Sequence, residues 1–283
     1  MAQATGLRRD EQPSNSAMAC SSEFWDALAP HHAGIENNYL DLRSVRRIVP
    51  QIRQPVLVVG AGQGLIVAEL HRQRFQCEGV DLSSEMIKYA KVRRDITLVH
   101  ANARALPFPE RKYATIIYAT GVIDFIGDEL EIASILKEGR RILMDSGKMF
   151  VAFYRVSAAI EEFLGKAGLL TGNVIAQRET LRLYLLNPAQ IVGFLTNRMR
   201  VGWFRAFALF LRISALSTSQ EKLMSLKMRN IFRKLDDPHA LINASPETQP
   251  YRDAVEIRNL FNRLNVPVKQ FNESPSCYVV QVQ

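Results

Sequence analysis

The 283-residue chain is predicted to fold as an α/β protein, a three-layer sandwich of helices around a mostly parallel sheet. Three observations predict this class. Short apolar runs rich in β-branched residues recur along the first half of the chain, as expected of strands buried on both faces. Segments with helical periodicity separate these runs. A glycine-rich turn joins the first run to the first of these helices, and the 47% hydrophobic content is sufficient for a full core.

The first strand–turn–helix unit organises the rest of the chain. Val56 to Val59 is the apolar run, and Gly60, Gly62 and Gly64 punctuate the turn before a helix predicted from Leu65. Glycine allows a sharp turn and close approach of a ligand, so this unit predicts a nucleotide-sized site at a helix N-terminus. A dinucleotide fingerprint would have glycine at the first, third and sixth positions. Here the sixth position is Leu65, which disfavours NAD without excluding it.

The second and third strands place polar residues at their ends. The second, Cys77 to Val80, ends at Asp81, and a carboxylate at such a strand tip can accept both hydroxyls of a ribose. Ser83 is a predicted cap of the following helix, with Met86 inside its first turn. The third strand, Thr97 to His100, leads into Asn102 and Ala103.

The fourth strand, Tyr113 to Tyr118, precedes Thr120 and Asp124 at the sheet edge where ligands bind in a doubly wound fold. Asp124 is the most attractive polar residue on the substrate side, and the alternative is an N-cap of the helix predicted over Leu130 to Arg141. An Asp-Ser-Gly turn at 145–147 is predicted to open the fifth strand, Met149 to Phe153.

The glycine turn, Asp81 and the later segments, in this order, resemble the class I (Rossmann-like) S-adenosylmethionine-dependent methyltransferases of the small-molecule type. The resemblance covers about residues 51–154 and 251–283. It implies a seven-stranded sheet with an antiparallel last strand, S-adenosyl-L-methionine as cofactor and S-adenosyl-L-homocysteine as product. The cofactor contacts that it implies are Gly60, Ala61, Gly62, Gly64, Asp81, Leu82, Met86, Asn102, Ala103 and Thr120.

The resemblance also suggests what some of these residues do. Asn102 stands where the family commonly has an Asp that takes the adenine amino group, and its amide oxygen can accept the same hydrogen bond. Leu82 and Met86 would form an apolar wall beside the adenine and ribose, although Met86 is equally explained as ordinary core. Thr120 would lie near the methionine part of the donor.

The N-terminal region is expected to be a loose tail over 1–20, followed by helices over 21–50. A helix capped by Ser22 is expected to end at Pro30. In the resembled family such helices fold over the cofactor cleft, which makes His31, His32, Glu36 and Tyr39 candidates for a lid; the alternative is that Tyr39 is core and the others are solvated.

A general base is needed only if the acceptor must lose a proton before attack. The candidates for this catalytic role are His32, Glu36, Tyr39, Asp124 and Tyr154.

Residues 155–250 are predicted to be a helical cap inserted after strand five, which in this family selects the acceptor. Its segment 188–234 holds nine Arg and Lys residues against Glu221 alone, and so accounts for the whole net charge of +8. Val201 to Leu216 is a largely apolar helix with Arg198, Arg205 and Arg212 on one stripe. Such a helix is either packed in the core of the cap or lies at a membrane surface.

The function expected from these features is methyl transfer by direct displacement to a small or amphipathic acceptor, at an O, N or S nucleophile. The alternatives are a lipid or quinone methyltransferase that works at a membrane surface through 188–234, and a protein that binds S-adenosylmethionine without methylating. Nucleic acid is disfavoured because the aromatic residues lie on an apolar helix rather than among basic ones. Three widely spaced cysteines and the histidine spacing indicate no metal site. No apolar run reaches about 20 residues and no signal peptide is apparent, so a cytoplasmic location, free or peripheral to a membrane, is expected.

Overall fold

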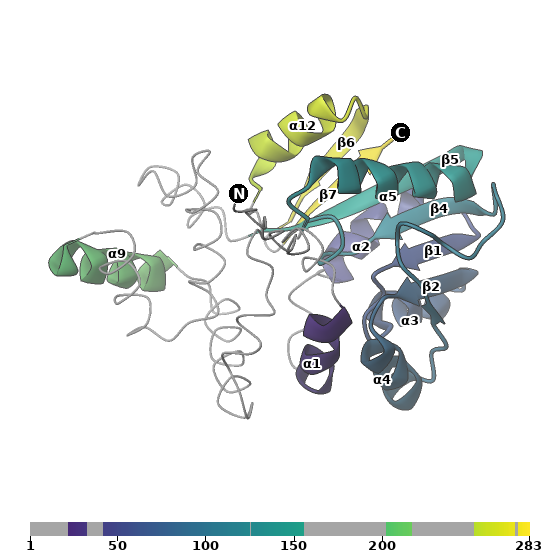
Figure 1. The fold of residues 1–283 in the computed structure, drawn as a ribbon, viewed down its shortest axis with the longest axis horizontal. Helices are drawn as coiled ribbons and strands as arrows, with labels where there is room; N and C mark the ends of the chain where they lie inside the picture. Colours follow the sequence, from purple (N-terminus) through teal and green to yellow (C-terminus); the bar gives the residue numbers. More distant parts are fainter. Residues whose placement is uncertain (1–21, 33–41, 125, 156–201, 217–251, 275–276) are drawn as a thin grey trace, which may run out of the picture.

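A computed structural model describes residues 22–32, 42–124, 126–155, 202–216, 252–274 and 277–283 (Figure 1). The predicted tail over 1–20 lies outside these ranges. So do the lid candidates Glu36 and Tyr39, and most of the predicted cap over 155–250.

One seven-stranded sheet forms the middle layer, with strand order β3-β2-β1-β4-β5-β7-β6. Strands β1 to β5 pair in parallel, and β7 runs antiparallel to both of its neighbours, which confirms the predicted architecture. The strands are β1 (Val56–Val59), β2 (Cys77–Asp81), β3 (Val99–His100), β4 (Tyr113–Tyr118), β5 (Leu143–Tyr154), β6 (Val268–Glu273) and β7 (Cys277–Val282).

Helices cover both faces of this sheet (Figure 1). A cluster of buried side chains joins α2 (Leu42–Ile48), α3 (Leu65–Arg72) and α4 (Ser84–Arg94) to one face, with a short 3-10 helix, η3 (Val49–Gln51), after α2. A second cluster joins α5 (Glu129–Ile142) and α12 (Ala254–Arg263) to the other. The alternating side chains of β1 explain both clusters, because Leu57 and Val59 belong to one and Val56 and Val58 to the other. Two further helices, α1 (Ser22–His32) and α9 (Trp203–Leu216), lie outside these clusters.

Two local predictions were wrong. Pro30 does not end the first helix, because α1 continues through it to His32. The Asp-Ser-Gly segment does not precede the fifth strand but bulges out within it: Tyr113 pairs with Leu143 and Thr115 with Lys148, so β5 uses five residues where β4 uses two. Such a bulge leaves the residues between unpaired while the strand continues on either side.

Cys77 and Cys277 are buried, and neither forms a disulfide. Within the described ranges, no helix is both long and apolar enough to span a bilayer.

Candidate functional site

A cavity lies at the carboxyl ends of β1, β2 and β4, where the loops after these strands meet the loop after β3 and the start of α5. This is the edge at which open α/β sheets bind ligands. Nine of the ten residues predicted to contact a cofactor line it; Gly64 does not. Their role as cofactor contacts stays a prediction.

The glycine turn needs glycine at each of its three positions. The backbone φ angles of Gly60, Gly62 and Gly64 are 71°, 54° and 78°, in the left-handed region that side chains disfavour. At Gly60 a Cβ atom would also meet Cγ2 of Val122 at 2.2 Å. Gly64 is the N-cap residue of α3, so its glycine serves the turn into the helix. The spacing of these glycines, at the first, third and fifth positions, therefore follows from the backbone conformation of this turn.

Asp81 ends β2 as a buried carboxylate at the wall of the cavity. The backbone N–H of Gly62 donates to its Oδ2 (2.7 Å) and that of Ser83 to its Oδ1 (2.9 Å). Burial raises the pKa of Asp81, although the backbone N–H groups of Ser83, Gly62 and Leu82 favour the charged form. The carboxylate thus holds the glycine turn against the tip of β2 and keeps free lone pairs at the cavity.

An apolar wall stands next to Asp81. The hydroxyl of Ser83 accepts the N–H of Met86 (3.0 Å), which confirms the predicted cap and begins α4 at Ser84. This cap brings Leu82 and Met86 to the cavity, and Met86 is 2% exposed. Both explanations of Met86 hold, since it is buried and also lines the cavity.

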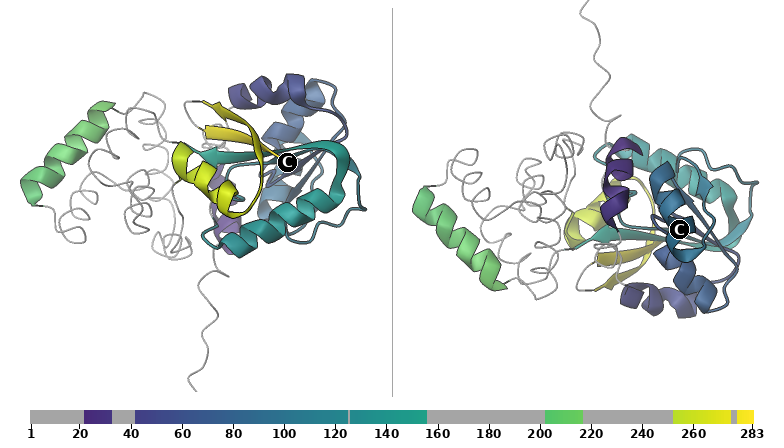
Figure 2. Two further views of the ribbon diagram at one scale, coloured as in Figure 1. Left: turned by 90° about the horizontal axis from the view of Figure 1, so that it is seen from above. Right: turned by 90° about the horizontal axis from the view of Figure 1, so that it is seen from below.

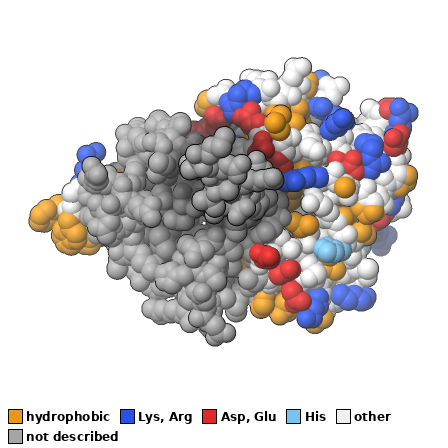
Figure 3. Space-filling view, in the orientation of Figure 1, with side chains coloured by type: hydrophobic (Ala, Val, Ile, Leu, Met, Phe, Trp, Pro, Cys, Tyr) orange, Lys and Arg blue, Asp and Glu red, His pale blue; other side chains and the backbone are white. Residues whose placement is uncertain are grey.

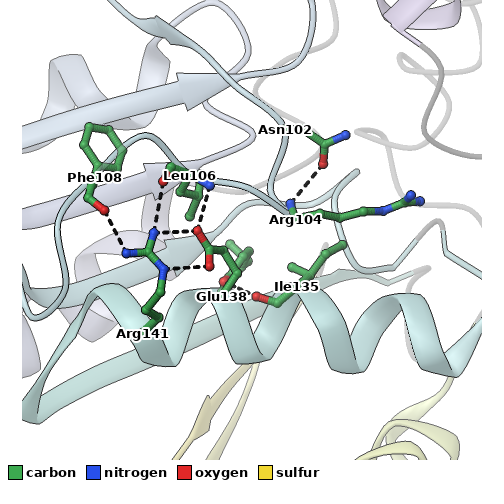
Figure 4. A network of polar contacts seen from close by, with 8 residues as sticks. Asn102, Arg104, Leu106, Phe108, Ile135, Glu138 and Arg141 are labelled. Atoms are coloured by element: carbon green, nitrogen blue, oxygen red, sulfur yellow. Dashed lines mark hydrogen bonds and ion pairs between the residues drawn. The ribbon is translucent and has the colours of Figure 1, made fainter.

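The loop after β3 contributes Asn102 and Ala103 to the cavity. The side-chain oxygen of Asn102 accepts the N–H of Arg104 (2.9 Å) and so shapes this loop (Figure 4). An amide oxygen has a second lone pair, so this bond leaves Asn102 able to accept from an adenine amino group.

Two charged residues of α5 hold the same loop in place (Figure 4). Glu138 accepts the N–H of Leu106 (2.8 Å), while Arg141 donates to the carbonyls of Leu106 (3.0 Å) and Phe108 (2.9 Å). Glu138 and Arg141 also pair with one another, and this hydrogen bonding lowers the pKa of Glu138. These bonds to α5 thereby hold the loop after β3 in position at the cavity.

The floor of the cavity is the turn after β4, where Thr120, Gly121 and Val122 line it. Asp124 lies in this turn and is buried, and its Oδ1 accepts the N–H of Gly121 (2.5 Å). It is not among the lining residues, and the N-cap of α5 is Asp128, so the N-cap alternative for Asp124 is wrong. Asp124 closes the turn that forms the floor.

A buried arginine supports this turn from below. Arg252 is 6% exposed and donates to the carbonyls of Asp124 (3.2 Å) and Ile126 (2.6 Å). Burial lowers its pKa to about 10, while the charge of Asp124 acts in the opposite direction. Because Arg252 lies two residues before α12, it ties the start of this helix to the floor of the cavity.

Helix α1 contributes one side chain to the wall of the cavity. Trp25 lines the cavity, and Oδ1 of Asp26 accepts the hydroxyl of Ser83 (2.5 Å) and the N–H of Glu85 (3.1 Å). On the next turn the carbonyl of Ala29 accepts the side-chain amide of Gln63 (2.5 Å). These bonds join α1 to α4 and to the glycine turn.

The candidate catalytic residues are placed less fully. His32 ends α1 and Tyr154 ends β5, but their side chains lie outside the described parts, as do all of Glu36 and Tyr39. Asp124 is displaced from the cavity wall, as described above. The catalytic role of all five therefore stays a prediction.

Sequence reasoning missed several residues of the cavity. Trp25 had a signal, since it lies in the helix that was expected to cover the cleft. Gln63 sits inside the glycine turn, between two of the predicted cofactor contacts. Arg104 and Glu131 form an ion pair at the wall formed by α5 and the loop after β3, and nothing in their spacing brings them together.

Comparison with known proteins points to one kind of domain. Residues 57–151 match the family model described as a methyltransferase domain. An uncharacterized protein of Methanocaldococcus jannaschii is 29% identical over 128 residues, which are 44% of this chain and 48% of that protein. The chain thus spans about half the length of this curated relative.

Solved structures share the fold. A SAM-dependent methyltransferase from Leishmania major superposes with a TM-score of 0.52 and 14% identity, covering 99% of this chain and 87% of that one. A second solved structure concerns the conversion of a disulfide bond into a thioacetal group during echinomycin biosynthesis. It superposes with a TM-score of 0.52 and 14% identity, covering 92% of this chain and 91% of that one. At these identities the likeness establishes the fold.

Proposed function

We propose that this chain, whose residues 57–151 match the model of a methyltransferase domain, is of the class I, S-adenosylmethionine-dependent type and transfers a methyl group from S-adenosylmethionine to a small or amphipathic acceptor. The cavity at the carboxyl ends of the strands is the proposed cofactor site. The acceptor would carry an oxygen, nitrogen or sulfur nucleophile, and residues 155–250 would take part in choosing it.

The observation that carries this proposal is the pairing of a glycine turn with the buried carboxylate of Asp81. The turn offers backbone with no side chain at Gly60 and Gly62, so a ligand can approach it closely. The carboxylate keeps lone pairs for the two hydroxyls of a ribose beside that turn. Leu82 and Met86 supply an apolar wall for an adenine ring. These residues fit an adenosine group and its extension toward Thr120.

Bound S-adenosylmethionine supplies a sulfonium methyl that is already activated toward displacement. The protein then has to align the acceptor and exclude water, and both contribute to the rate through pre-organisation. Trp25 on α1 covers the cavity and is suited to exclude water. Asp124 and Arg252 hold the turn that forms the floor and so fix the position of Thr120 and Gly121.

The test begins with calorimetric titration of S-adenosylmethionine, S-adenosylhomocysteine and NAD into the wild-type protein and Asp81→Ala. We expect the first two to bind, with lower affinity in the variant. Labelled S-adenosylmethionine is then offered with thiols, amines and phenols, and transfer of label to one class supports the proposal. Binding of NAD in their place, or of none of the three, would contradict it.

Two other functions remain candidates in this test. A protein that binds S-adenosylmethionine without methylating would bind both ligands and transfer label to no acceptor. A lipid or quinone methyltransferase is favoured by the exposed apolar side chains of α9 and would transfer label to an acceptor presented in vesicles. The same assay, run with and without vesicles that contain a quinone, separates these two cases.

A further inference from the structure

Helix α9 exposes a continuous group of large apolar side chains. Trp203, Phe204, Phe207 and Leu211 are 58%, 85%, 41% and 51% exposed. Elsewhere in the described residues the exposed large hydrophobic side chains stand singly, at Val92, Leu130 and Val255. Isolated apolar residues on a surface are ordinary, whereas a contiguous patch marks a contact surface.

The patch lies at one end of the molecule. Figures 1 and 2 show α9 farthest from the strands β2 and β1, and Figure 3 shows apolar atoms with basic atoms above them at that end. The indole of Trp203 stacks on the ring of Phe207 at 5.5 Å between centroids and meets the ring of Phe204 edge-on at 5.4 Å. Leu209 and Leu216 lie on the opposite side of the helix and are half-buried, and the half-buried Phe210 lies at the edge of the exposed group, with its ring 6.3 Å from that of Phe207 between centroids. The helix therefore turns one apolar side inward and presents a second one outward.

Two arginines border the outward apolar strip. At about 100° per residue, Trp203, Phe207, Leu211 and Phe204 follow one another around an arc of about 100°, and the exposed Arg212 and Arg205 lie about 80° to 100° beyond Phe204, at the far edge of the exposed side. No acidic residue occurs anywhere in α9. The outward side thus combines aromatic rings with a positively charged flank, the arrangement of a helix that lies in the headgroup region of a bilayer.

The charge pattern argues against a second copy of this chain as the occupant. Two copies packed through the apolar strip would bring their arginine flanks close together, and α9 holds no carboxylate to pair with them. Anionic headgroups supply that missing negative charge. With 14 residues the helix is about 21 Å long, which is too short to cross the hydrocarbon core but sufficient to lie along it.

We propose that α9 docks this protein on an anionic lipid surface, with its aromatic strip at the acyl boundary and Arg205 and Arg212 at the headgroups. Docking requires neither cofactor nor acceptor, so it goes beyond the proposed methyl transfer. The sequence alone is compatible with a helix in the core of the cap and with one that faces a membrane. The exposure of its apolar residues is what favours the membrane.

The first experiment measures binding of the full chain to vesicles of phosphatidylcholine, with and without phosphatidylglycerol, by flotation. We expect binding only to the anionic vesicles, with an affinity that falls as salt is added. The variant Arg205→Glu/Arg212→Glu should weaken this binding roughly thirtyfold or more. The control Lys137→Glu/Lys269→Glu makes the same change in net charge at exposed positions of the sheet domain and should bind within about twofold of wild type.

The second experiment tests the apolar strip. Phe204→Ser/Leu211→Ser should lose vesicle binding, while the control Val92→Ser/Leu130→Ser, at exposed positions elsewhere, should keep it. Vesicles should also shift the fluorescence of Trp203 to shorter wavelength, and the shift should disappear in Trp203→Phe, which leaves Trp25 as the remaining tryptophan.

Three results would overturn the proposal. One is vesicle binding that the α9 variants leave unchanged. Another is the absence of binding to anionic vesicles by a wild-type preparation that still binds S-adenosylhomocysteine. The third is a concentration-dependent dimer in sedimentation that Phe204→Ser/Leu211→Ser abolishes without vesicles, which would assign the strip to a second copy. Because cofactor binding is measured separately, failure of docking and failure of the proposed function are distinguishable.

Discussion

Replacement of Asp81 by asparagine is the sharpest test of the proposed cofactor site. The change keeps size and shape but removes the negative charge and one acceptor oxygen. Both oxygens are in use, since Gly62 donates to one and Ser83 to the other. In the variant one of these N–H groups faces an amide NH2, which should cost about 1–3 kcal/mol of unfolding free energy.

The effect on binding can be worked out from the same carboxylate. Two ribose hydroxyls that donate to a charged acceptor contribute about 1.5–3 kcal/mol each. A neutral acceptor makes bonds about half as strong, so the loss is roughly 1.5–3 kcal/mol. We therefore expect Asp81→Asn to bind S-adenosylhomocysteine about tenfold to a hundredfold more weakly by calorimetry. An analogue without ribose hydroxyls should bind both proteins alike.

The pH dependence provides an independent readout. Burial raises the pKa of Asp81, and donating hydroxyls favour its ionised form. Affinity of the wild type should therefore rise as pH increases through this raised pKa and then level off, whereas Asp81→Asn should lack the rise. Glu69→Gln is the matched control, because it neutralises a buried carboxylate that does not line the cavity. Equal losses for ligands with and without ribose hydroxyls would refute the reasoning and leave Asp81 a structural role only.

Three further changes test the supporting structure. Gly60→Ala adds a Cβ atom 2.2 Å from Val122 at a φ of 71°, so it should abolish ligand binding and lower the melting temperature. The control Gly202→Ala, with open space around it, should change neither property. Calorimetric titration measures the affinity and thermal unfolding the melting temperature, and unchanged affinity in Gly60→Ala would contradict the turn geometry. The pKa of Glu69 is lowered to about 2, mainly by hydrogen bonding from an arginine one turn away, against an ordinary 4.5. The ionised Glu69 carboxylate therefore stabilises the folded state above pH about 4.5, and this stabilisation is lost as pH falls toward about 2. This shift corresponds to up to about 3 kcal/mol of unfolding free energy, and roughly half of that is expected because the arginine partners are largely exposed. The unfolding free energy, measured with urea between pH about 2 and 4.5, should therefore depend less on pH in Glu69→Gln than in the wild type. Arg252→Met leaves buried carbonyls without their donor, so it should lower the unfolding free energy in urea by roughly 3 kcal/mol and weaken ligand binding. Arg252→Lys should restore both properties only in part. Wild-type affinity in a folded Arg252→Met would show that the floor of the cavity does not need this arginine.

Much of the fold was predictable because strong local signals agree with the tertiary structure. The predicted runs Val56–Val59 and Tyr113–Tyr118 match the observed strands residue for residue. Each is a short apolar run that is buried along its length, so its sequence carries both the strand preference and the burial. Ser83 was likewise predictable as a cap, since its hydroxyl acts within three residues.

Weaker segments were misjudged where neighbours decide the outcome. Pro30 signals a helix end, yet α1 continues, and its residues 29 and 30 bond through their carbonyls to Gln63 and Arg93. The Asp-Ser-Gly segment carries the composition of a turn, and pairing with β4 on both sides makes it a bulge. The third strand was expected to begin at Thr97, but only two of its residues pair with β2. In each case long-range contacts override a local preference.

The sequence by itself determined the chemistry of the candidate site: three glycines that a left-handed turn requires, and a carboxylate at the end of the next strand. These act over short chain distances or at strand ends, where order along the chain fixes position in a parallel sheet. Only the tertiary structure decided what surrounds them. Trp25 reaches the cavity because Asp26 is bonded to the start of α4, and Arg252 reaches the floor from more than 120 residues away. It also decided which side of α9 faces outward, since periodicity shows that a helix has two apolar sides but not which of them is covered.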